Sequence, residues 1–431
     1  MNEAISDRFQ AMPKRKSMSA RSMIVRIQPV SGSGTYACGS QVSFDIPTQM
    51  RNNTFIDMSQ SYLKYSMKLD ASLSGAVTLD VAGGGLFYDK VQVLSQGSQI
   101  TDINNYSAYR KHLVAQKVPL EWLARDGKVM LGTSGSTAGV TVSKTAKRYF
   151  CEPLSYLSPF FATESYLCGF SNDNLRLNLT WVNADRIGAW ATAQTASPTN
   201  ELVQFGDIEL VLRVVETTSA LTSQIIQAHN GIFSYPLDDV RVYNGVIPAG
   251  VDAHTQTIGA SFSSLSSVAF VMDDPTGYGH LNYDKIFIKN NLSSYGLLID
   301  GSVYPLRRTR VDIDSAEAMA ENRATQHALG DVSFVGNLNE KFDADLVTGN
   351  RGNWTTLPGG GFSGSVDLSV YAKKADSIRS GLNVLASNVQ LDLTFSALTP
   401  TQTNLHVFTF FDSLVTLDVR ENGTGVYSVA I

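Results

Sequence analysis

Two strand-like motifs each occur twice in this chain of 431 residues, and they come in the same order both times. LFYDKVQV at residues 86–93 returns as LNYDKIFI at 281–288, and NLRLNLTW at 174–181 returns as NVQLDLTF at 388–395. Both motifs alternate apolar and polar side chains, which is the pattern of a β-strand with one buried face. A chain of this length is too long for one hydrophobic core. We therefore predict one β-domain present twice, with loops of unequal length.

Composition favours β-sandwiches for these two domains. Only 17% of the residues are charged, while 43% are hydrophobic and 10% are aromatic. Helical bundles need more Lys and Glu on their surfaces than this chain offers. The alternating runs amount to about six to eight strands in each half, close to the eight of a jelly roll. The predicted fold is all-β, with two tandem eight-stranded jelly rolls (a double jelly roll) and short helices in the loops.

The domain boundaries follow from breaks in the strand pattern. Residues 1–35 lack periodicity and end in a Ser-Gly-Ser-Gly run, so we expect a basic N-terminal arm there. Residues 36–216 form the first predicted jelly roll, and the polar stretch 217–230 is the expected linker. Residues 231–431 form the second predicted jelly roll, ending in a C-terminal tail.

Helices are expected only in the loops. Asn104 and Asn105 are both placed to cap a short helix that contains Tyr109, His112 and Leu113. In the second half, a capping-box pattern predicts a helix over residues 315–329, after Tyr304–Pro305 has ended the strand character. Residues 132–143 and 336–364 are rich in Gly and polar residues and read as long loops.

The chain shows no constellation for catalysis or metal binding. Its six histidines and three cysteines are scattered, without the spacings of a zinc site or a disulfide framework. Asp273–Asp274 and Asp343–Asp345 could act as the paired carboxylates of a glycosidase or as calcium ligands. Both lie in turn-like sequence where Asp bonds the backbone, which favours a structural role. The basic cluster 307–310 lacks interleaved aromatic residues, which favours ion pairing with an acidic neighbour over nucleic-acid binding. We predict a structural protein, not an enzyme, with no catalytic residue, metal or cofactor.

Charge is distributed unevenly along the chain. Residues 1–26 carry a net charge of +4, whereas the whole chain carries −5. A basic arm on an acidic body suggests contact with a polyanion or an acidic neighbour, although a solvated terminus would look the same. The candidate residues for an inward-facing or neighbour-clasping arm are Lys14, Arg15, Lys16, Arg21 and Arg26.

The sequence has neither an apolar signal region nor a stretch of about 18 apolar residues. We therefore expect no secretion by a signal peptide and no transmembrane segment. The expected compartment is a reducing one: the cytoplasm, the nucleus, or a particle assembled there.

Several stretches together resemble a known family. The first is an opening strand at 42–47 with the segments 55–57 and 61–63 after it, and the second is the motif at 85–93 with its continuation at 96–97 and 102–103. The third is the loop at 304–305 with the helix at 315–329, and the fourth is the closing pair of strands from Val389 and Leu405. In these stretches the chain resembles the double jelly-roll major capsid proteins of the lineage of polinton-like viruses, virophages and, more distantly, adenovirus hexon. The resemblance covers nearly all of residues 36–420.

The resemblance implies a viral major capsid protein that assembles as pseudo-hexagonal homotrimers into an icosahedral shell around a DNA genome. It implies a place in the virion after assembly in the host cytoplasm or nucleus, with penton and minor capsid proteins as further partners. The strands would stand perpendicular to the shell, and the arm over 1–30 would face inward or clasp neighbours. Contact of the arm with the genome stays open. The modest loops do not predict tall towers like those of hexon.

Two other classes remain as alternatives. The first is a tandem β-sandwich protein that binds carbohydrate, for which Trp354 and Tyr278 are the candidate exposed aromatic residues. The second is a one-jelly-roll capsid protein of an RNA virus with a projecting domain. That alternative expects a longer basic arm and no repeat of the motif at 86–93.

Overall fold

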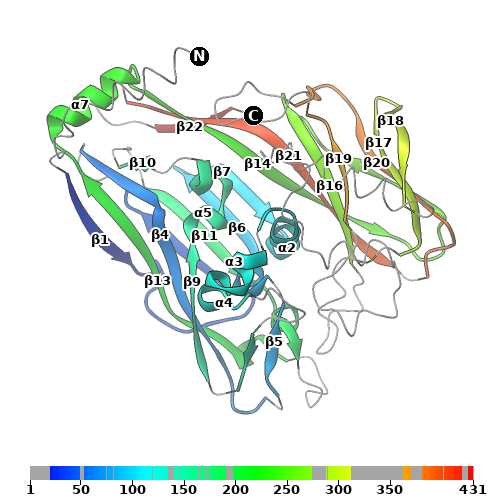
Figure 1. Cartoon of the computed structure of the whole chain (residues 1–431), viewed down its shortest axis with the longest axis horizontal. Helices are drawn as coiled ribbons and strands as arrows, with labels where there is room; N and C mark the ends of the chain where they lie inside the picture. Colours follow the sequence, from blue (N-terminus) through cyan, green and yellow to red (C-terminus); the bar gives the residue numbers. More distant parts are fainter. Residues whose placement is uncertain are drawn as a thin grey trace.

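The computed structural model shows two β-sandwiches side by side, with the small helices of the first lying toward the second (Figure 1). The residues that the structure describes are 20–48, 53–73, 75–80, 82–118, 120–133, 140–144, 146–163, 166–169, 171, 174–190, 198–273, 288, 290–311, 363–369, 381–400, 402–419 and 426–430.

Two antiparallel sheets build the first sandwich. In one sheet the order is β1-β13-β4-β10, with β2 added beside β13 and β9 beside β4. In the other the order is β3-β11-β6-β7. The bounds are β1 (Arg21–Ile27), β2 (Tyr36–Ala37), β3 (Gln41–Ile46), β4 (Thr54–Leu69), β6 (Tyr88–Ser95), β7 (Ser98–Asn104), β9 (Lys147–Pro153), β10 (Tyr166–Cys168), β11 (Leu175–Trp181) and β13 (Val203–Glu216).

The connections of the first sandwich carry its helices and a third, small sheet of order β12-β5-β8. The strands are β5 (Val77–Leu79), β8 (Thr141–Val142) and β12 (Gly188–Trp190). The helices are η1 (Gly83–Leu86), α2 (Tyr106–Lys117), α3 (Leu120–Ala124), α4 (Asp126–Met130), α5 (Leu154–Leu157), α6 (Pro159–Thr163), η2 (Ala184–Arg186) and η3 (Asn200–Leu202).

The second sandwich repeats this arrangement. Its sheets have the orders β14-β21-β16-β19, with β22 beside β21, and β15-β20-β17-β18. The helix α7 (Ser219–Ala228) lies between the sandwiches in sequence, within the predicted linker. The strands are β14 (Ile232–Ile247), β15 (Ala253–Ile258), β16 (Leu265–Asp273), β17 (Leu292–Ile299), β18 (Ser302–Arg310), β19 (Ser363–Asp367), β20 (Val389–Phe395), β21 (Thr403–Asp418) and β22 (Val426–Ala430).

The strand order identifies each sandwich as a jelly roll. Among the described strands, and apart from the short β2, β10 and β22, each half sends eight into its two large sheets. We number these eight strands in their order along the chain. Across one sheet the order is first, eighth, third and sixth, and across the other it is second, seventh, fourth and fifth. Both halves follow this rule, so the predicted all-β fold of two tandem jelly rolls with short loop helices is confirmed.

Aromatic side chains fill the space between the sheets. In the first jelly roll, Trp181 of β11 stacks on Phe205 of β13, with ring centroids 3.9 Å apart, and so joins the two sheets. In the second, the rings of Phe270 on β16 and Tyr295 on β17 meet edge to face at 5.1 Å. The alternation seen in the sequence places these side chains: Val42, Phe44 and Ile46 of β3, for example, are fully buried.

The structure confirms one of the two repeats and corrects the other. β11 and β20 hold the same place in their sheets, as the motifs at 174–181 and 388–395 predict. The counterpart of β6, however, is β17. β6 pairs with β11 and with the next strand, β7, and β17 pairs in the same way with β20 and with the next strand, β18. The alignment of 86–93 with 281–288 is therefore wrong as a strand equivalence, and residues 281–287 lie outside the described residues. A local alternating pattern cannot tell which neighbour a strand pairs with.

The loop predictions have mixed outcomes. The helix after Asn105 is confirmed as α2. The expected end of strand character at Tyr304–Pro305 is wrong, because both residues lie within β18. Among the described strands β18 pairs only with β17, and such an edge strand tolerates a proline that cannot donate to the ladder. The helix predicted over 315–329 lies outside the described residues.

Candidate assembly surface and the junction between the jelly rolls

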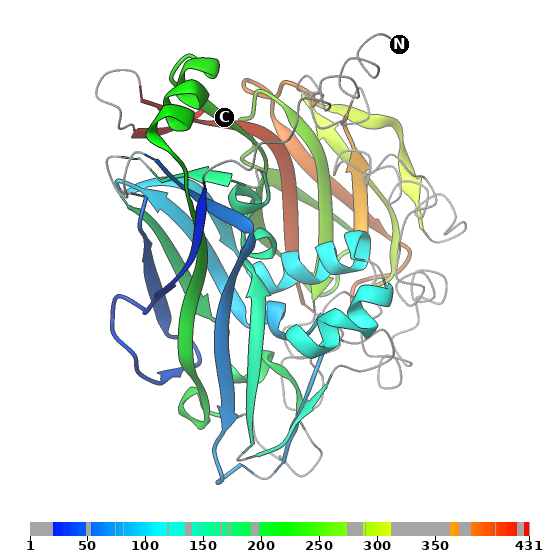
Figure 2. The ribbon, with the colours of Figure 1, turned by 60° about the vertical axis from the view of Figure 1, so that its left-hand side comes forward.

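The loop helices of the first jelly roll lie beside a sheet of the second (Figure 2). Aromatic side chains make the contact. Tyr109 and His112 of α2 lie with ring centroids 6.0 and 5.6 Å from that of Phe408 on β21. Phe160 of α6 meets Tyr235 of β14 edge to face at 6.0 Å. Large aromatic surfaces buried in this way stabilise association strongly. The junction is therefore a packed interface and not a flexible hinge.

A buried hydrogen bond adds specificity to this apolar contact. Nδ1 of His112 lies 3.0 Å from the hydroxyl oxygen of Ser363 on β19, and both side chains are fully buried. Burial lowers the pKa of His112 to about 4, so the ring is neutral at pH 7. A neutral imidazole pairs with a hydroxyl without the cost of a buried charge.

A second polar connection crosses the junction nearer to its surface. The amide of Asn105, a residue with φ of 47°, donates to Oδ1 of Asn244 on β14 at 2.7 Å. That oxygen lies 2.9 Å from Nδ1 of His406, whose Nε2 lies 3.0 Å from a carboxylate oxygen of Asp273. The chain of contacts links the start of α2 to three strands of the second jelly roll, and it fixes the register between the halves.

One carboxyl group at the junction titrates near neutrality. Asp239 of β14 is buried, and β14 contacts β7 of the first jelly roll. Burial raises the pKa of Asp239 to about 7, although the N–H of Val240 donates to its Oδ1 at 2.9 Å and opposes the shift. The carboxylate of Asp102 on β7 pushes the pKa in the same direction as burial. This side chain therefore changes its charge within the physiological pH range.

The first jelly roll also contains buried charges that the sequence analysis missed. Burial raises the pKa of Glu152 to about 7, while the guanidinium of Arg110 opposes the shift. Lys111, next to Arg110 on α2, donates to Oδ2 of Asp80 at 2.8 Å, with both side chains almost fully buried. Charged residues on a short helix in a loop are usually exposed to solvent, so the sequence gives no sign that these side chains are buried.

The described members of the predicted basic arm belong to a strand. Arg21 and Arg26 lie on β1, where they pair with Glu216 at 2.7 Å and Glu209 at 3.3 Å on the neighbouring β13. β1 thus lies in the sheet of the first jelly roll, although it falls within the range predicted as an arm. Lys14, Arg15 and Lys16 lie outside the described residues.

β1 is an edge of its sheet, since β13 is its only pairing partner among the described strands. Its side chains are largely exposed, and Ile24 is 61% exposed. An open edge with exposed apolar side chains offers main-chain hydrogen bonds and apolar area to a neighbour. β1 is therefore the candidate assembly surface of the first jelly roll.

The described residues do not bring the other sequence candidates together into a reaction centre. Within the described ranges, no three His, Cys, Asp or Glu side chains gather as a metal site would require. Asp273 contacts His406, and Asp274, Asp343 and Asp345 lie outside those ranges. Of the basic cluster 307–310, Arg308 forms the expected ion pair, with Asp392 of β20. Trp354 and Tyr278 are not described.

No described helix combines the length and apolar character needed to cross a membrane.

No family model and no curated protein matches the sequence. The structure, however, is similar to solved viral capsid proteins along nearly its whole length. The PBCV-1 virus capsid aligns with a TM-score of 0.64 and 12% identity, covering 98% of this chain and 100% of that one. The Faustovirus major capsid protein aligns with a TM-score of 0.59 and 9% identity, covering 94% and 91%. The mavirus major capsid protein aligns with a TM-score of 0.53 and 14% identity, covering 97% and 93%.

The chain has the double jelly-roll fold of viral major capsid proteins. The resemblance carried by stretches such as 42–47 and 85–93 is confirmed at the level of fold. The double jelly roll accounts for the repeated motifs, because each half must build the same two sheets.

Proposed function

We propose that this chain is a viral major capsid protein, and that three copies assemble into a pseudo-hexagonal capsomer of an icosahedral shell around a DNA genome. The observation that carries the proposal is the repeated strand order in two jelly rolls that share a buried junction. Three such chains around an axis present six similar jelly rolls, which suits a hexagonal lattice position. The three similar solved structures, all viral capsid proteins, support the same function.

The rigid junction is what makes the assembly geometry possible. A trimer resembles a hexagon only if the angle between the two jelly rolls is fixed in every copy. The aromatic contacts of α2 and α6 and the bond between His112 and Ser363 supply that constraint. The function proposed is thus structural, without catalysis or a cofactor.

The proposed role of the N-terminal arm is refined by β1. Arg21 and Arg26 lie on β1 and are held in the sheet of the first jelly roll by its pairing with β13. Lys14, Arg15 and Lys16 precede this strand and carry positive charge toward neighbouring trimers or the particle interior. Penton and minor capsid proteins are the further partners proposed, and the virion is the proposed location.

Assembly of the purified protein tests the proposal. Light scattering behind size exclusion should give three times the mass of one chain, and negative-stain images should show pseudo-hexagonal particles. A protein that stays monomeric at high concentration would contradict the proposed function.

A further inference from the structure

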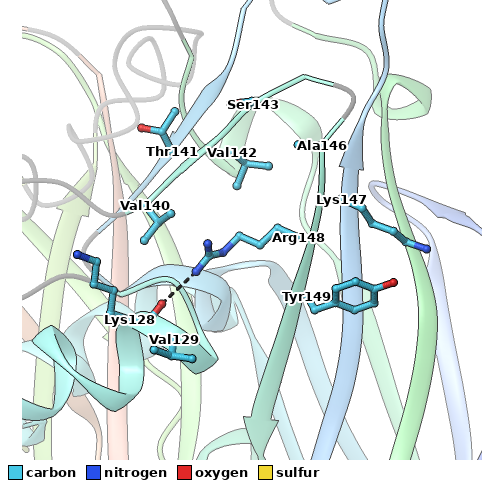
Figure 3. Close-up of a pocket in the computed structure, with 10 residues that line it drawn as sticks. All are labelled: Lys128, Val129, Val140, Thr141, Val142, Ser143, Ala146, Lys147, Arg148 and Tyr149. Carbon is cyan, nitrogen blue, oxygen red and sulfur yellow. Dashed lines mark hydrogen bonds between the residues drawn. The ribbon is translucent and has the colours of Figure 1, made fainter.

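A groove of about 610 Å³ lies between α4, the segment 140–143 and β9 of the first jelly roll (Figure 3). Among the described strands β9 pairs only with β4, so its other edge is open toward this groove. The structural role of the fold does not require a hollow of this kind. Its lining indicates what it can bind.

The groove is positively charged. Lys128, Lys147 and Arg148 line it, and none of the ten lining residues is acidic. Lys147 is neutralised by an ion pair with Asp207. In the described part of the chain, no carboxylate lies within ion-pair distance of Lys128 or Arg148. Two cations without a counter-charge, close together, favour an anionic ligand.

The guanidinium of Arg148 is held in place. Its Nη2 donates to the carbonyl oxygen of Lys128 at 3.0 Å, and the group lies 5.6 Å from the ring centroid of Phe150. Gly132, with φ of +70°, leaves room for it, because a Cβ there would lie 3.3 Å from Nε. Nε is buried and has no hydrogen-bond partner among the described residues, so a ligand in the groove meets the two outer nitrogens of the guanidinium. An arginine fixed in this way presents its donors to an oxyanion at little entropic cost.

The remaining lining is suited to a sugar. Val129 is 78% exposed at the mouth of the groove, and Val140 lies between Lys128 and Arg148 in the close-up (Figure 3). Thr141 and Ser143 add hydroxyl groups. A pyranose ring carries C–H groups on its faces and hydroxyls around its rim, which match such a mixture. Two cations that have no ion-pair partner among the described residues are too few to follow the phosphate backbone of a nucleic acid over several nucleotides.

We propose that this groove binds an acidic carbohydrate. The sulfate or carboxylate group of the sugar lies at Lys128 and Arg148, and the ring packs on Val129 and Val140. The remaining hydroxyls of the sugar bond Thr141 and Ser143.

The position of the groove fits attachment of a particle to a surface. In the strand ladder, Lys147 of β9 lies opposite Lys68, near the end of β4. Arg21 of β1 lies opposite Glu216 of β13, at the other end of the sheet. The 16 residues of β4 separate these ends by about 50 Å. If the arm before Arg21 faces the particle interior, the groove faces outward. This outward position rests on the proposed function, but the binding itself does not.

Calorimetry on the full chain at low salt tests the binding. The probes are a heparin-derived hexasaccharide, 3′-sialyllactose, neutral lactose and a single-stranded hexanucleotide. We expect the wild type to bind at least one acidic sugar and to bind lactose and the oligonucleotide at least about tenfold more weakly. The two acidic probes distinguish sulfate from carboxylate as the bound group.

Charge reversal identifies the site. Lys128→Glu, on the exposed end of α4, should weaken binding of the acidic sugar at least about tenfold. Arg148→Lys should also weaken it, because lysine keeps the charge but loses the fixed fork of donors. Arg310→Glu on β18 makes the same change of net charge far along the chain and should leave binding unchanged.

Equal affinity of Lys128→Glu and Arg310→Glu would overturn the proposal, as would oligonucleotide binding as tight as that of the sugar. Trimer mass is measured on the same samples. Trimers that bind no acidic sugar would refute the carbohydrate site alone. A monomer that binds the sugar through Lys128 would refute the capsid function alone.

Discussion

His112 and Ser363 are 251 positions apart in the sequence, yet Nδ1 of the first lies 3.0 Å from the hydroxyl oxygen of the second. The bond connects α2 of the first jelly roll with β19 of the second, inside an interface of aromatic rings. Because the two halves share this buried contact, mutations at the junction should affect the whole chain and not one half.

Replacing His112 with alanine should therefore destabilise both jelly rolls together. The change leaves a cavity against Phe408 and a buried hydroxyl at Ser363 without its partner, at a cost of about 2–4 kcal/mol. Thermal unfolding followed by tryptophan fluorescence should show a lower midpoint. His229→Ala, at an exposed histidine, should cost less than about 1 kcal/mol. Equal losses in the two variants would argue against a structural role of the junction.

The pKa of Asp239 predicts how stability depends on pH. Burial raises this pKa to about 7 in the folded chain, so between about pH 4 and pH 7 the folded state holds a proton that the unfolded state has released. The stability due to the protonated form is full below pH 4 and is lost as the pH rises through 7. Asp239→Asn, which stays neutral, should be more stable than the wild type at pH 8, by about 1–3 kcal/mol.

The adjacent Asp238 provides the matched control, because its side chain is exposed while that of Asp239 is buried. Asp238→Asn should leave the pH profile of chemical denaturation close to that of the wild type. An Asp239→Asn variant that loses stability at pH 8 would show that the folded chain stabilises the carboxylate form of Asp239 and not the protonated form.

A sequence pattern predicts structure here where the property behind it is local, and fails where distant strands decide. Alternation along 174–181 and 388–395 predicted two strands at equivalent positions, because burial of one strand face is a local property. The choice of 281–288 over β17 as the counterpart of β6 failed because pairing is decided by distant strands. The three consecutive residues Arg110, Lys111 and His112 are all buried, since α2 lies between the two jelly rolls. The local sequence of α2 does not indicate that the second jelly roll buries its other face.

The ion pairs of β1 should contribute little to stability. The side chain of Arg21 is 72% exposed, so its pair with Glu216 is well solvated. A double-mutant cycle with Arg21→Ala and Glu216→Ala should give a coupling free energy of about 0.2–1 kcal/mol, smaller at high salt. A coupling above about 2 kcal/mol would indicate that the strand edge is desolvated, for example by a neighbouring copy. Repeating the cycle under conditions that dissociate the trimer distinguishes these cases.

The pair of Lys111 and Asp80 should behave in the opposite way. Both side chains are almost fully buried, with Nζ and Oδ2 2.8 Å apart, and Oδ1 of Asp80 also accepts from the N–H of Ala82 at 3.1 Å. Lys111→Met removes the positive charge and leaves a buried carboxylate, which should cost about 3–5 kcal/mol. The exposed pair of Arg176 and Asp45, also 2.8 Å apart, is the control, and Arg176→Met should cost less than about 1 kcal/mol. Similar unfolding midpoints for the two variants would contradict the stabilising role assigned to the buried ion pair.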